Sequence, residues 1–328
     1  MRPTQYSFPP RVRTGIFILF AVLFVSGAAV IRNDKSKSRK VLAHWPGVSY
    51  LIQERDKTVL NAQAMTLSFI QPSFDPLANF IIYHQPIDIS EIRALKGYYA
   101  KAITFYPDVG EVYGMAGLAS YFLEDWDEAI AHLKTATLLN PGFIWFHYNL
   151  GLTYLKTSQF ALAQKSLEKA IKTNPSTNLS IVLQSRWFRQ IYAPIPAFRE
   201  FKIKKSLWQG YQNSYKLLIL MTWEEKEFSS MLNYAESALI SDIGEKDAFL
   251  YYAGRAAYEL GDHAKAVDYF KKAIHENDGL GDAYYYLALS LKALGQNQEA
   301  KQLSKYPQPE EGNSFIDHDI QRISVKVF

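Results

Sequence analysis

Small and apolar residues recur along the middle of the chain at the spacing of a helix. Ala129, Leu133 and Ala136 fall at positions i, i+4 and i+7, so they lie on one face of a helix. A polar turn at Leu123-Glu124-Asp125 precedes this stripe, and Asn140-Pro141 follows it. Because proline cannot continue a helix, the pattern predicts a helix that ends near Asn140.

The same pattern returns at a fixed distance. Gly110 to Thr177 divides into two equal blocks that repeat each other, a third copy opens at Asp247, and a fourth follows one block later. Each block holds a small pair in its first helix, which lets the second helix pack closely; the pairs are Ala116-Gly117, Leu150-Gly151, Ala253-Gly254 and Leu287-Ala288. One such hairpin cannot bury its apolar face alone, so the repeats predict a stack of helical hairpins.

These positions resemble the tetratricopeptide repeat (TPR), in which the first helix carries tryptophan, leucine, glycine and tyrosine and the second carries alanine, phenylalanine, alanine and proline. Here Tyr113, Gly117, Ala129, Ala136 and Pro141 occupy such positions. The block length is also that of the helix–turn–helix repeat, about 34 residues. The resemblance implies an all-α fold, a right-handed α-solenoid of TPR helix–turn–helix repeats. It also implies that the small and aromatic residues at these positions serve packing rather than catalysis.

The repeats divide the chain into segments. Glu91 to Tyr106 reads as a lone second helix, and Tyr211 to Asp242 as a degenerate hairpin. We therefore expect the following order: an irregular helical cap at 41–90, TPR units at 91–177, an irregular helical connector at 178–211, TPR units at 212–305 with the first one degenerate, and a C-terminal tail at 306–328.

The connector carries three local signals. A helix is predicted from Ile181 to Tyr192, and Asn178-Leu179-Ser180 matches a glycosylation acceptor, a tripeptide that is common by chance. Phe198 to Trp208 is basic and aromatic. We interpret this run as an irregular connector with solvated lysines; the alternative is a contact with an acidic partner or RNA.

Residues 14–31 hold no charge, which predicts a single transmembrane helix. A polar N-terminal tail at 1–13 precedes the predicted anchor, and a basic linker at 32–40 follows it. The alternative is a cleaved secretory signal, with Ser26 and Ala28 next to the cleavage site. Basic residues flank both ends, so the sequence leaves open on which side of the membrane the repeats lie.

Composition excludes several kinds of chemistry. The chain has no cysteine, which rules out disulfides, thiolate nucleophiles and cysteine zinc sites. Its net charge of +4 comes largely from the N-terminal segment before residue 41, so we expect no nucleic-acid partner. The histidines form no metal-binding pair, and no phosphate loop or nucleophile elbow occurs. We therefore expect no enzyme activity, no cofactor and no metal.

The resemblance also implies a binding face. In this family, the second, fifth, ninth and twelfth positions of each first helix line the concave side of the stack. From these positions we select a protein-binding groove: Tyr121, Trp145, Tyr148, Leu152, Tyr251, Arg255, Tyr258 and Tyr285. Only Asn149 occupies a position of the family's carboxylate clamp. The alternative is that these aromatic side chains pack against other segments of the same chain.

Together these features predict a membrane-anchored TPR adaptor or scaffold that binds a protein partner, in the assembly or biogenesis of a membrane-associated complex. Aromatic side chains favour this interpretation because they bury a large area at a small entropy loss. Two alternatives remain: a scaffold that self-associates at the membrane surface, and an enzyme with a site in the irregular middle segment. The oligomeric state and the partner's identity stay open.

Overall fold

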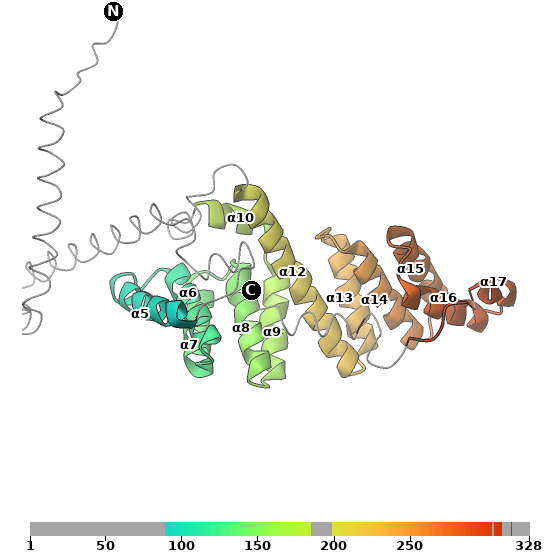
Figure 1. The fold of residues 1–328 in the computed structure, drawn as a ribbon, viewed down its shortest axis with the longest axis horizontal. Coiled ribbons are helices and arrows are strands. Elements are labelled where there is room, and N and C mark those ends of the chain that lie inside the picture. The colour runs from blue at the N-terminus through green and yellow to red at the C-terminus, as the bar shows by residue number, and fades with distance from the viewer. Residues whose placement is uncertain (1–88, 185–198, 304, 310–315, 317–328) are drawn as a thin grey trace, which may run out of the picture. The chain divides into compact units, whose positions relative to one another are not determined.

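A computed structural model describes residues 89–184, 199–303, 305–309 and 316 of the chain. All regular structure in these ranges is helical, which confirms the all-α prediction there (Figure 1). The predicted tail, anchor and linker at 1–40 lie outside the described residues, as does the cap up to residue 88. Residues 185–198 of the connector and most of the C-terminal tail also lie outside them.

The helices fall into three groups along the chain. The first group is α5 (Ile89–Phe105), α6 (Gly110–Phe122), α7 (Trp126–Leu139), α8 (Ile144–Lys156) and α9 (Phe160–Lys172). The second is α10 (Pro175–Gln184) and the long α12 (Arg199–Glu224). The third is α13 (Phe228–Ile240), α14 (Lys246–Glu259), α15 (His263–Glu276), α16 (Gly281–Ala293) and α17 (Asn297–Gln302).

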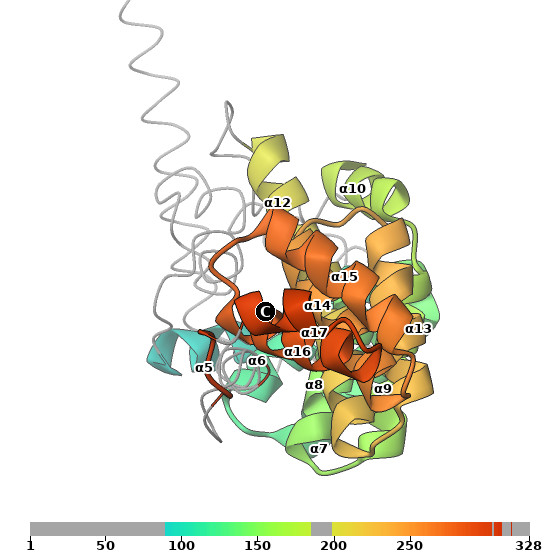
Figure 2. The same cartoon turned by 90° about the vertical axis from the view of Figure 1, so that its right-hand side faces the viewer.

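Successive helices pair as hairpins because the small residues of the first helix admit the side chains of the second. A Cβ atom added to Gly117 of α6 would lie 2.6 Å from Cγ of Leu133 on α7. At Gly254 of α14 it would lie 2.7 Å from the Phe270 ring on α15. The first helices α8, α14 and α16 and the second helices α9 and α13 can be followed as two layers in Figure 2.

The turn inside each hairpin holds one residue in the left-handed region. These residues are Glu124, Ser158, Lys226, Gly261 and Gly295, with φ between 57° and 79°. Glu124 lies in the polar turn that the sequence predicted, and Lys226 marks the turn of the degenerate hairpin. Its first helix is the C-terminal part of α12, and its second helix is α13. Ala235 and Ala238 of α13 are buried.

The α12–α13 hairpin follows the α8–α9 hairpin directly in the stack. Helix α12 packs on α9 and α8. The Tyr234 hydroxyl of α13 donates a 2.7 Å hydrogen bond to the Glu168 carboxylate of α9. The next second helix repeats this contact, since Tyr269 Oη of α15 donates a 2.6 Å bond to Glu236 of α13. Helix α10 is therefore an insertion between two consecutive hairpins, and it packs against α12.

The connector differs from its predicted form. Its first helix begins at Pro175 rather than at Ile181, because proline is well tolerated in the first turn of a helix. The predicted boundary at residue 211 falls inside α12, which continues as one helix from Arg199 to Glu224. Most of the basic run at 198–208 is thus helical rather than irregular, since residues 199–224 contain no proline to interrupt a helix.

Asn178 of α10 fastens the insertion to the stack. Its side chain is fully buried. Its Oδ1 accepts a 2.8 Å bond from the backbone N–H of Ile144, and its Nδ2 donates to the Gly142 carbonyl at 3.0 Å and to Tyr211 Oη at 3.0 Å. The glycosylation signal at Asn178 is therefore wrong for the folded chain, because an amide enclosed in this way cannot receive a sugar.

Exchanging glycine for alanine should have opposite effects at two helical sites. Gly254→Ala should lower the free energy of unfolding by about 1–2 kcal/mol, because the new methyl group overlaps the Phe270 ring. Gly97→Ala, on α5 with no atom within 4 Å of the added Cβ, should raise it by about 0.5–1 kcal/mol. Urea unfolding followed by circular dichroism measures both changes. A stabilised Gly254→Ala variant would contradict the close contact.

Removing the Asn178 side chain should weaken the array. Asn178→Ala leaves the Ile144 amide and the Gly142 carbonyl without their partner. We expect a loss of about 2–4 kcal/mol in the free energy of unfolding. Gln184→Ala on the same helix removes only an exposed hydrogen bond to Ser180 and should change stability by less than about 0.5 kcal/mol. Equal effects of the two variants would refute the assigned role of Asn178.

Candidate functional site

Most residues of the predicted groove are buried within the chain. Exposed fractions of 0–7% are found for six of the eight, namely Tyr121, Trp145, Tyr148, Leu152, Tyr251 and Arg255. The remaining two, Tyr258 and Tyr285, are half-buried. A partner that approached the first helices would therefore meet these last two directly, whereas it would have to displace parts of the chain to reach the others.

Helix α12 packs against Trp145 and Tyr148, two of the predicted groove residues of α8. A Cβ atom added to Gly210 of α12 would lie 3.6 Å from ring atoms of Trp145. Asn213, also on α12, donates a 3.5 Å hydrogen bond to Tyr148 Oη. Burial raises the pKa of Tyr148 well above its ordinary value, so its hydroxyl stays protonated. Packing within the chain, the alternative interpretation, accounts for this part of the groove, while its role in partner binding stays a prediction.

In the C-terminal part of the helical stack, an arginine on one first helix lies against aromatic rings of two neighbouring first helices. The guanidinium carbon of Arg255 on α14 lies 4.7 Å from the ring centre of Trp223 on α12 and 3.6 Å from that of Tyr286 on α16. Such stacking is favourable because the face of an aromatic ring carries partial negative charge. Arg255 is only 5% exposed, so it joins α12, α14 and α16 from within.

The polar contacts of Arg255 are incomplete. Its Nη2 donates a 2.9 Å bond to Glu259, one turn along the same helix, and no residue described by the structure accepts from its Nε. Nearby, Tyr251 Oη donates to Asp282 at 3.4 Å. Burial opposes the charge of Arg255, but Tyr251, Tyr286 and Glu259 outweigh this effect and hold its pKa above the ordinary value.

Half-buried rings surround this arginine. Tyr286 packs edge-on against Tyr258 at 5.5 Å and against Tyr285 at 5.1 Å between ring centres. We use the name Arg255 face for the set Trp223, Arg255, Tyr258, Glu259, Tyr285 and Tyr286. Tyr258 and Tyr285 can offer a partner flat apolar area, whereas the guanidinium of Arg255 is buried behind them.

The sequence predicted only half of the Arg255 face. Its repeat positions indicated Arg255, Tyr258 and Tyr285, but they did not indicate the other three residues, which are Trp223, Glu259 and Tyr286. The sequence could have indicated Trp223. It stands two repeat periods after Leu155, which occupies the twelfth position of its block, one of the positions expected to line the concave side. Tyr286 occupies the sixth position of α16, as Asn149 does in α8, and the resemblance connected that position only with the carboxylate clamp.

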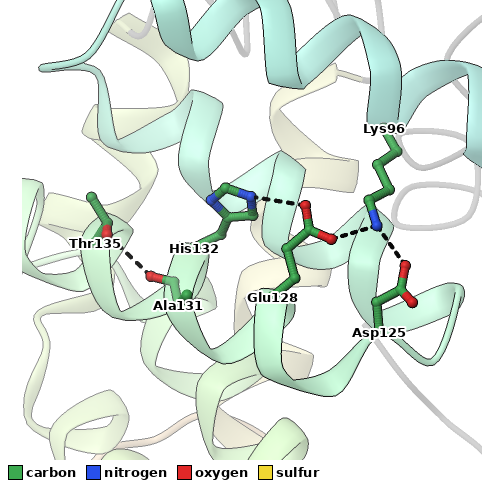
Figure 3. Close-up of polar contacts among 6 residues, drawn as sticks. All are labelled: Lys96, Asp125, Glu128, Ala131, His132 and Thr135. Atoms are coloured by element: carbon green, nitrogen blue, oxygen red, sulfur yellow. Dashed lines mark hydrogen bonds and ion pairs between the residues drawn. The ribbon is translucent and has the colours of Figure 1, made fainter.

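A second polar cluster joins α5 to the start of α7 (Figure 3). Lys96 Nζ contacts Asp125 Oδ2 at 2.5 Å and also the Glu128 carboxylate, which in turn lies 3.5 Å from His132 Nε2. The hydrogen bonds that Lys96 donates to these two carboxylates raise its pKa. Because the lysine is held by two carboxylates, we interpret the cluster as an ion-pair contact between second helices.

No group of three or more histidine, aspartate or glutamate residues within the described ranges could hold a metal ion. Nor does any helix in those ranges have the length and apolar character needed to cross a membrane. The predicted anchor at 14–31 lies outside the described ranges, so the membrane span stays a prediction.

Paired helices stacked in two layers define this chain as a helical-repeat protein. Comparison with protein-family models identifies the repeat. Residues 117–158 match a TPR repeat model, and residues 146–177, 232–282 and 282–305 match three tetratricopeptide repeat models. The chain therefore contains tetratricopeptide repeats, as the period of its sequence predicted.

Two solved structures are among those similar to this chain. A crystal structure of MamA protein is 16% identical, with 67% of this chain and 97% of that chain covered and a TM-score of 0.41. The structure of YrrB, described as a TPR protein with an unusual peptide-binding site, is 13% identical, with 68% and 97% covered and a TM-score of 0.45. Likeness at this level carries no conclusion about the function of this chain.

Lys96→Met should lower the free energy of unfolding by less than about 1 kcal/mol, because the ion pairs are partly solvated, and the effect should shrink in 1 M salt. The raised pKa of Lys96 means that its contribution is present below pH 10.5 and is lost as the pH rises through the higher pKa of the folded state. Urea unfolding at several pH values measures this. Lys101→Met, an exposed site on the same helix, is the control; an identical effect there would argue against the cluster.

Proposed function

We propose that this chain is a membrane-tethered TPR scaffold that binds a protein partner through its Arg255 face. The half-buried rings around a buried arginine are the observation that carries the proposal. Trp, Tyr and Arg dominate binding energy at protein interfaces, since they combine large contact area with directional hydrogen bonds. The tetratricopeptide repeats agree with a binding rather than a catalytic role, although a fold alone does not define a function.

The tether is the second part of the proposal. It rests on the uncharged run at residues 14–31 and on the basic linker at 32–40. An anchored chain would hold its partner at the membrane surface, as expected for assembly or biogenesis of a membrane-associated complex. The cleaved secretory signal is the competing possibility. Extraction at alkaline pH, combined with the intact mass of the mature chain, distinguishes the two.

Site-specific photo-crosslinking in intact membranes tests the binding face. A crosslinking amino acid at Tyr285 should capture a protein partner. The same group at Ile240, which is 85% exposed at the end of the second helix α13, should not capture that partner. Tyr258→Ala combined with Trp223→Ala should reduce the capture at Tyr285 by at least about tenfold, because both anchors of the face are lost.

Leu138→Ala is the matched control, since Leu138 is an 81% exposed apolar residue on the second helix α7. It should leave the capture at Tyr285 unchanged. Equal capture from Tyr285 and Ile240, or full capture by the double variant, would contradict the proposed face. If the captured protein is a second copy of this chain, the alternative of a self-associating scaffold replaces the adaptor.

A further inference from the structure

The N-terminal part of α12 extends beyond the hairpin that this helix forms with α13. Helix α12 has 26 residues, whereas α13 has 13. At about 1.5 Å per residue, this difference leaves roughly 20 Å of α12 without α13 beside it. Leu207 and Tyr211 of this part are buried, with exposed fractions of 0% and 1%. Lys204, one turn before Leu207, is exposed, so the packed part of α12 ends between these two residues.

This end of α12 carries a local excess of positive charge. Its basic residues are Arg199, Lys202, Lys204 and Lys205, and its one acidic residue is Glu200. Residues 41–328 as a whole hold slightly more acidic than basic side chains. The basic end of α12 is therefore an exception within this part of the chain, and it can attract an anionic surface.

Aromatic residues accompany these charges. Lys204 Nζ lies 5.1 Å from the ring centre of Trp208, which is half-buried. Positions 201, 205 and 208 recur at i, i+4 and i+7, so Phe201 and Lys205 share one side of α12 with Trp208. Gly210 occupies the opposite side, where an added Cβ would lie 3.6 Å from side-chain atoms of α8. The basic and aromatic positions therefore lie on the side of α12 that faces away from α8.

We propose that this end of α12 binds an anionic lipid surface, with Lys204 and the neighbouring basic residues on the lipid phosphates and Trp208 in the interfacial layer. Basic residues near a charged bilayer are attracted to its headgroups, and tryptophan prefers the boundary between headgroups and acyl chains. A lipid surface is favoured over an acidic protein or RNA because the proposed tether at 14–31 would keep a membrane close to this end of α12 at high effective concentration.

The lipid contact is distinct from the Arg255 face. Trp223 of that face lies 15 positions after Trp208 on α12, a separation of roughly 22 Å along the helix axis. The inference goes beyond the proposed function and uses only its tether, which supplies the membrane. A tether together with a second lipid contact would hold the stack in one orientation, with the start of α12 against the bilayer and its last residue, Glu224, away from it.

A single fluorescent label on the full-length chain in lipid vesicles tests the inference. The chain has no cysteine, so Lys204→Cys creates one attachment site for the environment-sensitive dye nitrobenzoxadiazole. In vesicles with about 30% phosphatidylglycerol, the dye should emit at least about threefold more strongly than in phosphatidylcholine alone, and about 0.5 M salt should remove this gain. The same dye on Glu224→Cys, an exposed site roughly 30 Å along α12, should emit equally in both vesicles.

Two variants that carry the dye at position 204 examine charge and aromatic contact. Lys202→Gln combined with Lys205→Gln should lower the gain at least about fivefold, because each lysine contributes to attraction by a charged surface. Lys271→Gln combined with Lys272→Gln makes the same change of charge at exposed sites on α15 and should leave the gain unchanged. Trp208→Ala should lower the gain about twofold. The lysine variant keeps the test valid if Trp208→Ala does not fold.

Equal emission in the two kinds of vesicle would overturn the inference, as would an unchanged gain in the Lys202 and Lys205 double variant. An equal or larger gain with single-stranded RNA or polyglutamate, added to neutral vesicles, would overturn it in favour of that polyanion. The dye decides the inference whether or not alkaline extraction releases the chain, whereas release counts against the tether. Capture at Tyr285 judges the binding face separately.

Discussion

The close approach of two helices at a glycine or alanine is the constraint on which the described array depends. At Gly117 and Gly254 there is no room for even one methyl group, because a side chain of the second helix occupies the space. That contact fixes how each hairpin closes, and the left-handed residue in each turn allows it. The closed hairpin then presents an apolar face that only another hairpin can cover, which explains why the units stack.

Stacking has a consequence for the first helices. Where neighbouring first helices meet, large side chains fill the space between them, as Tyr148 does beneath α12 and Tyr251 does on α14. Arg255 is an exception, because a charge is buried there and is stabilised by two rings and one carboxylate. Burying this charge is costly, and the two rings and the carboxylate offset part of that cost.

The insertion between α9 and α12 is attached to the stack by hydrogen bonds of a buried side chain. Asn178 attaches it through hydrogen bonds to the start of α8 and to Tyr211. The sequence showed a loss of period and a glycosylation tripeptide there, and neither observation indicated a buried amide. Local pattern fails at Asn178 because its partners Gly142 and Tyr211 lie a whole repeat away along the chain.

The sequence by itself determined the repeat, the helical hairpins, their turns and the packing role of Gly117, Leu133 and Ala136, because these depend on spacing within one period. It also supplied the uncharged run at 14–31, whose role as an anchor rests on composition alone. The tertiary structure decided which face residues are buried and that Trp223 and Tyr286 enclose Arg255. These features depend on side chains from separate repeats meeting in space, and no single period encodes such a meeting.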